Sequence, residues 1–208
     1  LDLVNSYNNR KVNPTHWKEE VYKGIDYTGK MISQRQGNVV LLAGNNQKKT
    51  AYIKKSIDAG LNVLSDKPMA ISSKDFDSLQ QAFTTAAQKH LLLYDIMTSR
   101  YEMSNMLEKE MMQLEKTFGK MEQGTLESPA IIKQSTHHFF KSVSGKIVIR
   151  PEWYFDVEQE GSGIVDVTTH LVDLVQWETN PVTILNYKKD INVLKAKQWA
   201  TQISASEF

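Results

Sequence analysis

The feature that most constrains the fold is an alternation of apolar runs with helical patterns in the first half of the chain. Three short runs are mostly apolar, namely Val39–Ala43, Leu61–Leu64 and Leu91–Tyr94. Two stretches with helical periodicity separate them, Gln47–Ala59 and about Ser73–Lys89. Strand, helix, strand, helix, strand at this spacing predicts a parallel sheet joined by right-handed crossovers. A continuous apolar strand such as the first is typical of a sheet that is covered on both faces.

The two helical stretches also predict which side chains are buried. In the first, Tyr52, Ile53 and Ile57 fall on an inward face,. We interpret the lysines of this stretch as a solvated outer face: Lys48, Lys49, Lys54 and Lys55. In the second, apolar residues spaced by three and four form one buried stripe: Phe76, Leu79, Phe83 and Ala86,.

Polar side chains follow the carboxyl end of each predicted strand. Pro68 cannot donate to a sheet ladder, so the second strand must end by Lys67. The polar groups at the three strand ends are Asn45 and Asn46, then Asp66 and Lys67, then Asp95 and Arg100. Ligands bind at this edge of open α/β sheets. One polar loop means little, but three in succession favour a ligand site.

The second half has a different pattern. Met103–Lys116 predicts a helix whose methionines and leucines form a core stripe,. After Gly119, the runs that read as strands no longer alternate with helices: Met121–Glu127, Ala130–Phe140, Val182–Tyr187 and Ile191–Trp199. The sequence therefore predicts an α/β fold with a partial parallel sheet in residues 1–118, followed in residues 119–208 by an α+β domain with a mainly antiparallel sheet. His137 and His138 would point to opposite faces of a strand.

The segment Gly161–Trp177 begins with two glycines, Gly161 and Gly163, and continues as a mostly hydrophobic stretch. On a continuous helix, Asp166, His170 and Asp173 stand at i, i+4 and i+7 and form a polar stripe. A lone histidine on such a helix is usually a satisfied core group. An aspartate one turn earlier favours instead an oriented general base. A metal site is the less favoured reading, because no cysteine or second clear histidine joins these residues, and we expect no metal.

Composition excludes several classes of function. The 208 residues carry a net charge of +1, which gives no electrostatic reason to expect binding to nucleic acid or to a membrane,. There is no cysteine, so disulfides, thiolate metal sites and a cysteine nucleophile are excluded,. No apolar run approaches the roughly 20 residues that span a bilayer. We expect a cytoplasmic protein, with the periplasm left open because the chain begins at Leu1,.

These motifs together resemble the glucose–fructose oxidoreductase, inositol dehydrogenase and MocA (Gfo/Idh/MocA) family. Its members carry Glu-Lys-Pro after a strand of a Rossmann domain, and here Asp66 replaces the glutamate before Lys67 and Pro68. They also carry Gly-Gly-x-x-x-Asp-x-x-x-His, which matches Asp166 and His170, although Ser162 interrupts the glycines. The resemblance covers roughly residues 38–177. Short stretches of sequence within it further resemble a bacterial branch described as oxidoreductases.

The resemblance implies an NAD(P)-dependent oxidoreductase whose cofactor is NAD or NADP and whose substrate is a sugar, a polyol or a related hydroxyl compound. It implies a role for specific residues: catalysis by Lys67, Asp166 and His170, cofactor binding by Asn45, Asn46, Asp66, Lys67 and Pro68, and substrate binding by Lys67, Arg100, Asp166 and His170. It also implies a homo-oligomer formed through the antiparallel sheet. An NAD-dependent glycosidase of the same fold and a non-catalytic ligand sensor remain alternatives.

The glycine-rich Gly-x-Gly-x-x-Gly loop that seats a dinucleotide diphosphate does not occur in this sequence,. In the family it precedes the region that begins here. We therefore interpret residues 1–118 as the C-terminal part of a Rossmann-like domain that lacks its first βαβ unit. We expect the acidic residue that selects between NAD and NADP to belong to that unit.

Overall fold

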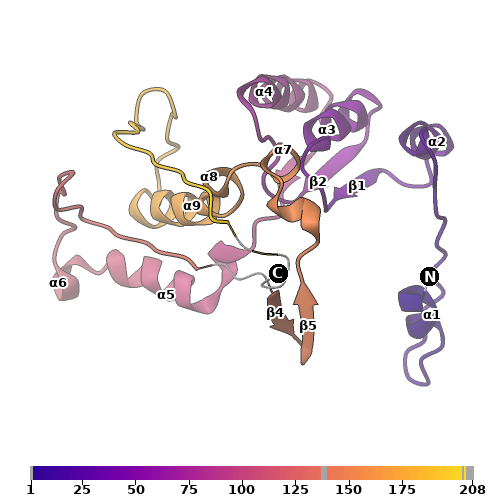
Figure 1. Ribbon diagram of the computed structural model, residues 1–208, viewed down its shortest axis with the longest axis horizontal. Helices are drawn as coiled ribbons and strands as arrows, with labels where there is room; N and C mark the ends of the chain where they lie inside the picture. The colour runs from indigo at the N-terminus through magenta and orange to yellow at the C-terminus, as the bar shows by residue number, and fades with distance from the viewer. Residues whose placement is uncertain (1, 137–139, 203, 205–208) are drawn as a thin grey trace.

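The computed structural model describes residues 2–136, 140–202 and 204 and contains the predicted parallel sheet (Figure 1). Its strands are β1 (Val39–Leu42), β2 (Asn62–Ser65) and β3 (Leu93–Asp95), in the order β1-β2-β3. Both pairs are parallel, and Val63 of β2 lies opposite Val40 and Leu93. The three carboxyl ends therefore meet at one edge of the sheet, as the sequence predicts.

The core lies between this sheet and two helices, α3 (Lys49–Asp58) and α4 (Ser73–Gln88). Its buried side chains are those of Ile53, Ile57, Val63, Leu79, Ala82, Ala86 and Leu93. The predicted stripe of α4 is confirmed at Leu79 and Ala86, whereas Phe76 and Phe83 are 38% and 44% exposed. Burial of one isoleucine contributes about 1.5–3 kcal/mol, so this small cluster is the main source of stability for the sheet.

The expectation that the sheet is covered on both faces is wrong for this chain. Val39 and Leu41 alternate with Val40 and Leu42 along β1, and the first two are exposed. Tyr94 of β3 is exposed on the same open side. Because α3 and α4 both pack on one face, the other face has no covering element among the described residues. A continuous apolar strand thus shows that a face can be covered, and not that it is.

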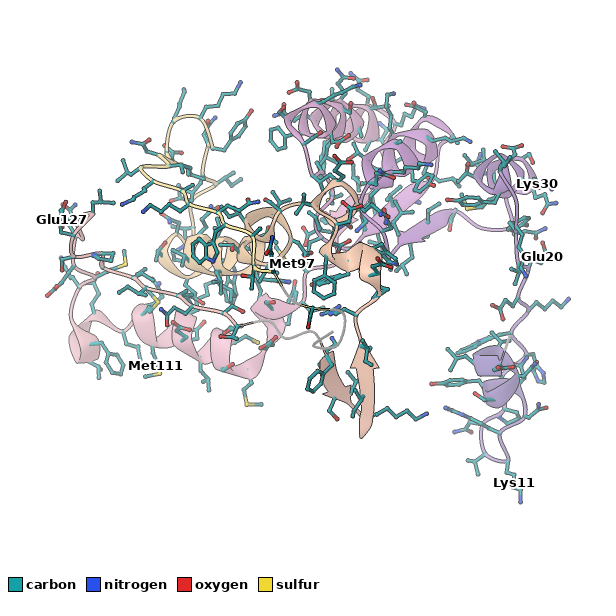
Figure 2. The ribbon with its side chains drawn as sticks, viewed as in Figure 1. Lys11, Glu20, Lys30, Met97, Met111 and Glu127 are labelled. Carbon is teal, nitrogen blue, oxygen red and sulfur yellow. The ribbon has the colours of Figure 1, made fainter. Side chains whose placement is uncertain are left out.

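The remaining helices lie beside the sheet or apart from it, with α1 and α6 at opposite sides of the view (Figure 1). They are α1 (Asp2–Asn8), α2 (Tyr27–Gln34), η1 (Ser99–Tyr101), α5 (Met103–Met112), α6 (Glu115–Phe118), η2 (Glu152–Phe155), α7 (Val157–Glu160), α8 (Gly163–Asp166) and α9 (Thr168–Thr179). α9 packs against α5, α8 and η1, so the second half of the chain folds back onto the loop after β3. Met97, labelled in Figure 2, lies in that loop near the centre of the view. Among the described residues, no helix has the length and apolar character needed to cross a bilayer.

The second sheet is antiparallel, as expected, but most of the strands predicted for it are wrong. It is a hairpin of β4 (Phe140–Val143) and β5 (Lys146–Ile149). The predicted strands at residues 121–127, 182–187 and 191–199 are irregular. Of the described residues within the predicted strand at 130–140, only Phe140 lies in β4. His137 and His138 lie outside the described residues. Alternating apolar residues form a strand only when a partner edge is present, and these segments have none among the described residues.

The methionine stripe of α5 is also not a core. Met103, Met106 and Met111 are exposed, as is Leu107. α5 does pack against α9, but through other positions: the ammonium of Lys109 lies over the ring of Trp177, and Gln113, just after α5, donates to the backbone oxygen of Glu178. Helical spacing of apolar residues gives the phase of a face and leaves open what covers it.

Replacement of a core isoleucine measures how much the sheet depends on this cluster. Ile57→Ala removes a side chain that is 0% exposed and should lower the free energy of unfolding by about 2–5 kcal/mol,. Ile184→Ala, at a side chain that is 98% exposed, is the matched control and should change it by less than about 0.5 kcal/mol,. Urea unfolding followed by circular dichroism gives both values. Equal effects of the two substitutions would contradict the assigned core.

Candidate active site

Lys67 and Asp166 meet at the carboxyl edge of the parallel sheet. Lys67 follows β2, and its Nζ donates to Oδ1 of Asp166 over 2.6 Å and to the backbone oxygen of Asp166 over 2.5 Å. Asp166 is the last residue of α8 and is only 4% exposed. A buried carboxylate needs a charged partner, and Lys67 supplies it. Two residues separated by 99 positions in the sequence thus form one buried ion pair.

Tyr154 completes the surroundings of Asp166 and was not foreseen from the sequence. Its hydroxyl, on η2, donates to Oδ2 of Asp166 over 3.0 Å. Burial, and then the Asp166 carboxylate, raise the pKa of Tyr154 to about 12, so the phenol keeps its proton near neutral pH,. The Arg150 guanidinium lies 4.4 Å from the centre of the tyrosine ring. Both carboxylate oxygens of Asp166 therefore accept a hydrogen bond from a charged or strongly held donor.

His170 is held from the loop after β3. Its Nδ1 lies 3.1 Å from Oγ of Ser99 in η1. Ser99 is itself anchored, because the side chain of Asn105 donates to the Ser99 backbone oxygen over 2.7 Å. A hydrogen bond at Nδ1 fixes the orientation of the imidazole ring and selects the tautomer at Nε2. His170 is thus held by a residue of the loop after β3, and Asp166 by a residue that follows β2.

The predicted continuous helix is broken between these two residues. α8 ends at Asp166 and α9 begins at Thr168, with Val167 between them at φ −97° and ψ −51°. Asp166 faces Lys67, whereas His170 faces Ser99. Of the expected stripe, His170 and Asp173 both contact η1 from α9, whereas Asp166 lies at the end of the preceding helix.

Arg100 and Asp173 form a second ion pair beside His170. Nε of Arg100 donates to Oδ2 of Asp173 over 2.7 Å, and Nη2 donates to Oδ1. This hydrogen bonding to Asp173 is the largest cause of the raised pKa of Arg100. The pair ties η1 to α9 and engages both groups within the protein. A role of Arg100 in substrate binding remains a prediction, and Asp173 has a cationic partner in place of the metal weighed above.

The polar groups after β1 and β2 form a third network. Lys49 is 2% exposed, and its Nζ donates to the side chains of Asn46 and Asp66. The second carboxylate oxygen of Asp66 accepts from the backbone N–H of Gly44 over 3.3 Å. The prediction that Lys49 belongs to a solvated face is wrong. The carboxylate at the end of β2 draws this lysine inward, which helical periodicity alone could not show.

Asn45 and Asn46 link the turn after β1 to α7. Nδ2 of Asn46 donates to the backbone oxygen of Glu160 over 2.9 Å, and Nδ2 of Asn45 donates to Oε1 of Gln159 over 2.9 Å. Asn46 is buried and Asn45 is exposed. Asn45 is thus the more accessible of the two asparagines, and their proposed contact with a cofactor remains a prediction.

Gly161 sets the path of the chain between α7 and α8. Its φ is +95°, a conformation that favours glycine,. A Cβ at this position would lie 3.0 Å from Cγ2 of Ile71, which follows Pro68 on the segment after β2. The close approach of these two segments places Glu160 and Asp166 next to Lys67.

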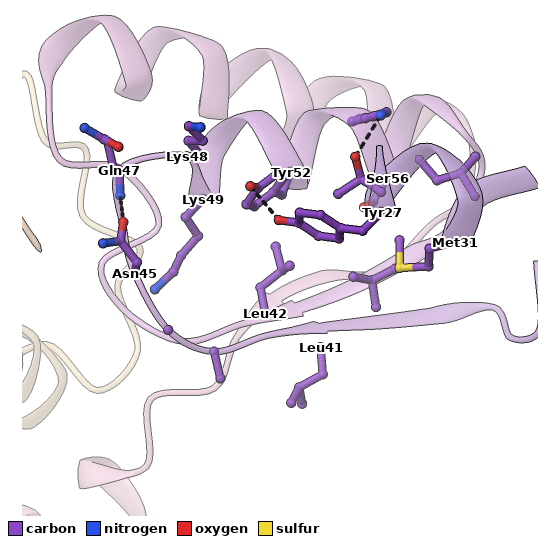
Figure 3. Close-up of a pocket in the computed structure, with 16 residues that line it drawn as sticks. Tyr27, Met31, Leu41, Leu42, Asn45, Gln47, Lys48, Lys49, Tyr52 and Ser56 are labelled. Atoms are coloured by element: carbon purple, nitrogen blue, oxygen red, sulfur yellow. Dashed lines mark hydrogen bonds between the residues drawn. The ribbon is translucent and has the colours of Figure 1, made fainter. Parts of the chain in front are cut away.

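A cavity of about 540 Å³ adjoins this network (Figure 3). It lies between α2, β1 and α3, and Figure 3 shows Lys49 and Asn45 at one end and Tyr27 and Met31 at the other. Its polar end is formed by Gly44, Asn45, Gln47, Lys48 and Lys49, and its apolar part by residues that include Leu42 and Tyr52. The hydroxyl of Tyr27 donates to that of Tyr52 over 2.6 Å. Lys67, Asp166 and His170 are not among its lining residues.

Substitution of Asp66 tests the buried pair with Lys49. Asp66→Asn leaves a buried ammonium without its carboxylate and should lower the free energy of unfolding by about 2–3 kcal/mol, below the full cost of breaking a buried pair because Asp66 is itself partly exposed,. Asp58→Asn breaks the exposed pair with Lys54 on the same helix and should cost less than about 0.5 kcal/mol,. Urea unfolding at neutral pH compares the two. Equal, small losses would show that Lys49 is not held by Asp66.

Two protein-family models match the chain. Residues 5–94 match the family model described as "Oxidoreductase family, NAD-binding Rossmann fold" (GFO_IDH_MocA). Residues 107–208 match the model described as "Putative oxidoreductase C terminal domain". No curated protein matches the sequence.

Solved structures are similar over most of the chain. The crystal structure of a "putative oxidoreductase" from Parabacteroides merdae ATCC 43184 is 52% identical over 99% of this chain, with a TM-score of 0.92. This chain spans 47% of the length of that protein. An NAD-binding protein from Listeria innocua shares the fold at 18% identity, with a TM-score of 0.53, over 72% of this chain and 39% of its own. GenD2 from gentamicin A biosynthesis, solved in complex with NAD, shares it at 16% identity, with a TM-score of 0.52, over 73% and 38%. The chain belongs to the Gfo/Idh/MocA family of oxidoreductases with an NAD-binding Rossmann fold.

Proposed function

We propose that the natural protein carrying this sequence is an NAD(P)-dependent oxidoreductase that acts on a hydroxyl group of a sugar, polyol or related compound. The observation that carries the proposal is the buried Lys67–Asp166 pair at the carboxyl edge of the sheet, with His170 on the following helix. Ligands bind at this edge of open α/β sheets. Membership of the family supports the same reaction class.

The residues present fit a dinucleotide in their chemistry. Gly44 and Asn45 line the polar end of the cavity, and a Cβ at Gly44 would meet no atom within 4 Å, so the backbone there is open to a ligand. Amide side chains suit the hydroxyls and carboxamide of NAD. Asn45, Asp66 and Pro68 would hold the cofactor at this edge, with Asn46 supporting the turn. When bound, the nicotinamide supplies the hydride chemistry.

His170 is the residue suited to take the proton of the substrate hydroxyl. Its Nδ1 lies 3.1 Å from Oγ of Ser99, and in the tautomer in which Nδ1 donates to that hydroxyl, Nε2 is the basic atom,. An imidazole has an ordinary pKa near neutrality and can therefore act as a general base there. Ser99, on the loop after β3, fixes the position of this base relative to the sheet edge.

Lys67 is suited to stabilise negative charge on the substrate oxygen. Its ammonium has three donors, and two contacts to Asp166 leave capacity for a ligand,. In a partly buried site such a cation stabilises a developing alkoxide more strongly than it would in water. Asp166 keeps the ammonium charged and in place, and Tyr154 holds Asp166 in turn.

The substrate class, the self-association and the cellular location are part of the same proposal. The choice of a sugar or polyol follows from the family resemblance and from the hydroxyl chemistry of Lys67 and His170. Self-association is proposed through the β4–β5 hairpin, whose strands are exposed throughout. A cytoplasmic location is proposed with it.

Replacement of Lys67 or His170 tests the assignment. In the natural protein, Lys67→Met and His170→Asn should each lower turnover about 100-fold or more, because each removes a group that acts on the transferred proton or its charge. Lys54→Met, an exposed lysine, is the control and should leave turnover unchanged. Formation of reduced nicotinamide with a panel of sugars and polyols is the measurement, and circular dichroism reports folding.

Unchanged turnover in both variants would overturn the roles given to these residues. Net hydrolysis of a glycoside without consumption of NAD would assign the protein to the glycosidase alternative. Failure of the wild-type protein to bind NAD or NADP would contradict the proposal as a whole.

A further inference from the structure

Glu160 is a buried carboxyl that the proposed reaction does not use. It ends α7 and is only 8% exposed. Its Oε2 is shielded from solvent and has no hydrogen-bond partner among the described residues. Its backbone oxygen accepts from the side chain of Asn46, so it is fixed to the turn after β1. A buried and unpaired carboxylate oxygen is costly in its ionised form, and the cost falls when the carboxyl holds a proton.

The charged groups around Glu160 show why it has no partner. The residues that face it are Lys49 on α3, Asp66 and Lys67 after β2, Asp166 on α8 and Tyr154 on η2. Lys49 is paired with Asp66, and Lys67 with Asp166. Two ammonium groups are therefore matched by two carboxylates, while the tyrosine stays neutral. Glu160 is the third carboxyl, and neither ammonium is left to pair with it, because the remaining cation, Arg150, lies over the ring of Tyr154.

We propose that Glu160 is a positioning residue that holds a proton while the cluster is empty and releases it to solvent when a positively charged group binds beside Lys67. In the proposed function, on which this inference rests, that group is the oxidised nicotinamide ring. Glu160 then favours the oxidised cofactor over the reduced one, whose ring is neutral. It acts through the charge of the cluster and makes no contact with reacting atoms.

The pH dependence of stability follows from the same geometry. Burial, and then the Asp166 carboxylate, raise the pKa of Glu160 from its ordinary 4.5 to about 7. Between these values the folded chain binds more protons than the unfolded chain, so the free energy of unfolding falls as pH rises through this window. The stability contributed by the protonated form is complete at the acidic end and lost above about pH 7,.

Glu160→Gln tests this part without any ligand. The amide resembles the protonated carboxyl in shape and cannot ionise. The midpoint of urea unfolding of E160Q should therefore rise relative to that of the wild type between about pH 5 and about pH 8. E158Q, at an exposed glutamate on the same helix, is the matched control and should follow the wild type. Parallel profiles of E160Q and the wild type would overturn the inference.

A measurement on the wild-type protein makes the result independent of how the variant folds. Infrared spectroscopy should detect the C=O stretch of a protonated carboxylic acid at about pH 6, where exposed carboxylates are already ionised. The band should disappear by about pH 8 and be retained at about pH 6 in E158Q but not in E160Q. Absence of the band from the wild type at about pH 6 would also overturn the inference.

Binding of the cofactor tests the functional part. The natural protein is titrated calorimetrically with NAD⁺ and with NADH at about pH 7, in buffers of different ionisation enthalpy. Binding of NAD⁺ should release a fraction of a proton, and binding of NADH should release less. E160Q should lose the difference between the two cofactors, and E158Q should keep it. An unchanged difference in E160Q overturns the role of Glu160. No binding of either cofactor overturns the proposed function instead, and the infrared and unfolding results then stand apart from it.

Discussion

The ion pair between Lys67 and Asp166 is the interaction on which the rest of the structure depends. It joins the segment after β2 to α8, two parts of the chain that belong to different halves of the sequence. Asp166 is almost fully buried, and a carboxylate in that position is tolerated only because Lys67 and Tyr154 occupy both of its oxygens,. The same contact therefore stabilises the association of the two halves and keeps a cation at the ligand edge.

Much of the parallel sheet could be predicted, because its signals are local. Apolar runs and helical periodicity give strand and helix directly, and the rule that parallel strands place their carboxyl ends together gives the edge. Burial could not be predicted with the same success. Lys49 was expected in solvent and is buried by Asp66, whereas the methionines of α5 were expected in the core and are exposed. In each case the burial of the side chain depends on which segment packs against its helix. The sequence of that helix alone does not show which segment this is.

The antiparallel region shows the same limit more strongly. A strand forms only beside another strand. The alternation of apolar residues within 182–199 predicts one apolar face but does not identify the strand that would pair with it. The structure instead places its antiparallel pair in β4 and β5, joined by Ser144 and Gly145, both at positive φ. The fold class was predictable from the change in pattern after Gly119, and the individual strands were not.

For the candidate site, the motif residues and their supports differ in how they could be found. The structure brings Lys67 to Asp166, and strand-end topology together with the family motif indicates this pair. Tyr154 lies in an aromatic run that resembles ordinary packing, and Glu160 carries no spacing signal at all. The break at Val167 separates Asp166 from His170, and nothing in the apolar pattern marks it. Side chains that support a site act through three-dimensional contacts, so their roles appear only when the fold is known.

Gly161 shows how such a site constrains sequence change at a position without chemistry. Its backbone conformation disfavours every residue with a side chain, and the space beside it is already filled by Ile71,. Either restriction could be relieved by a local adjustment, but the two together oppose the same substitutions from different directions. Substitutions of Gly161 should therefore be disfavoured even in related proteins that differ at Lys67 or Asp166. A glycine at this position would then mark where the segment between α7 and α8 approaches the segment after β2.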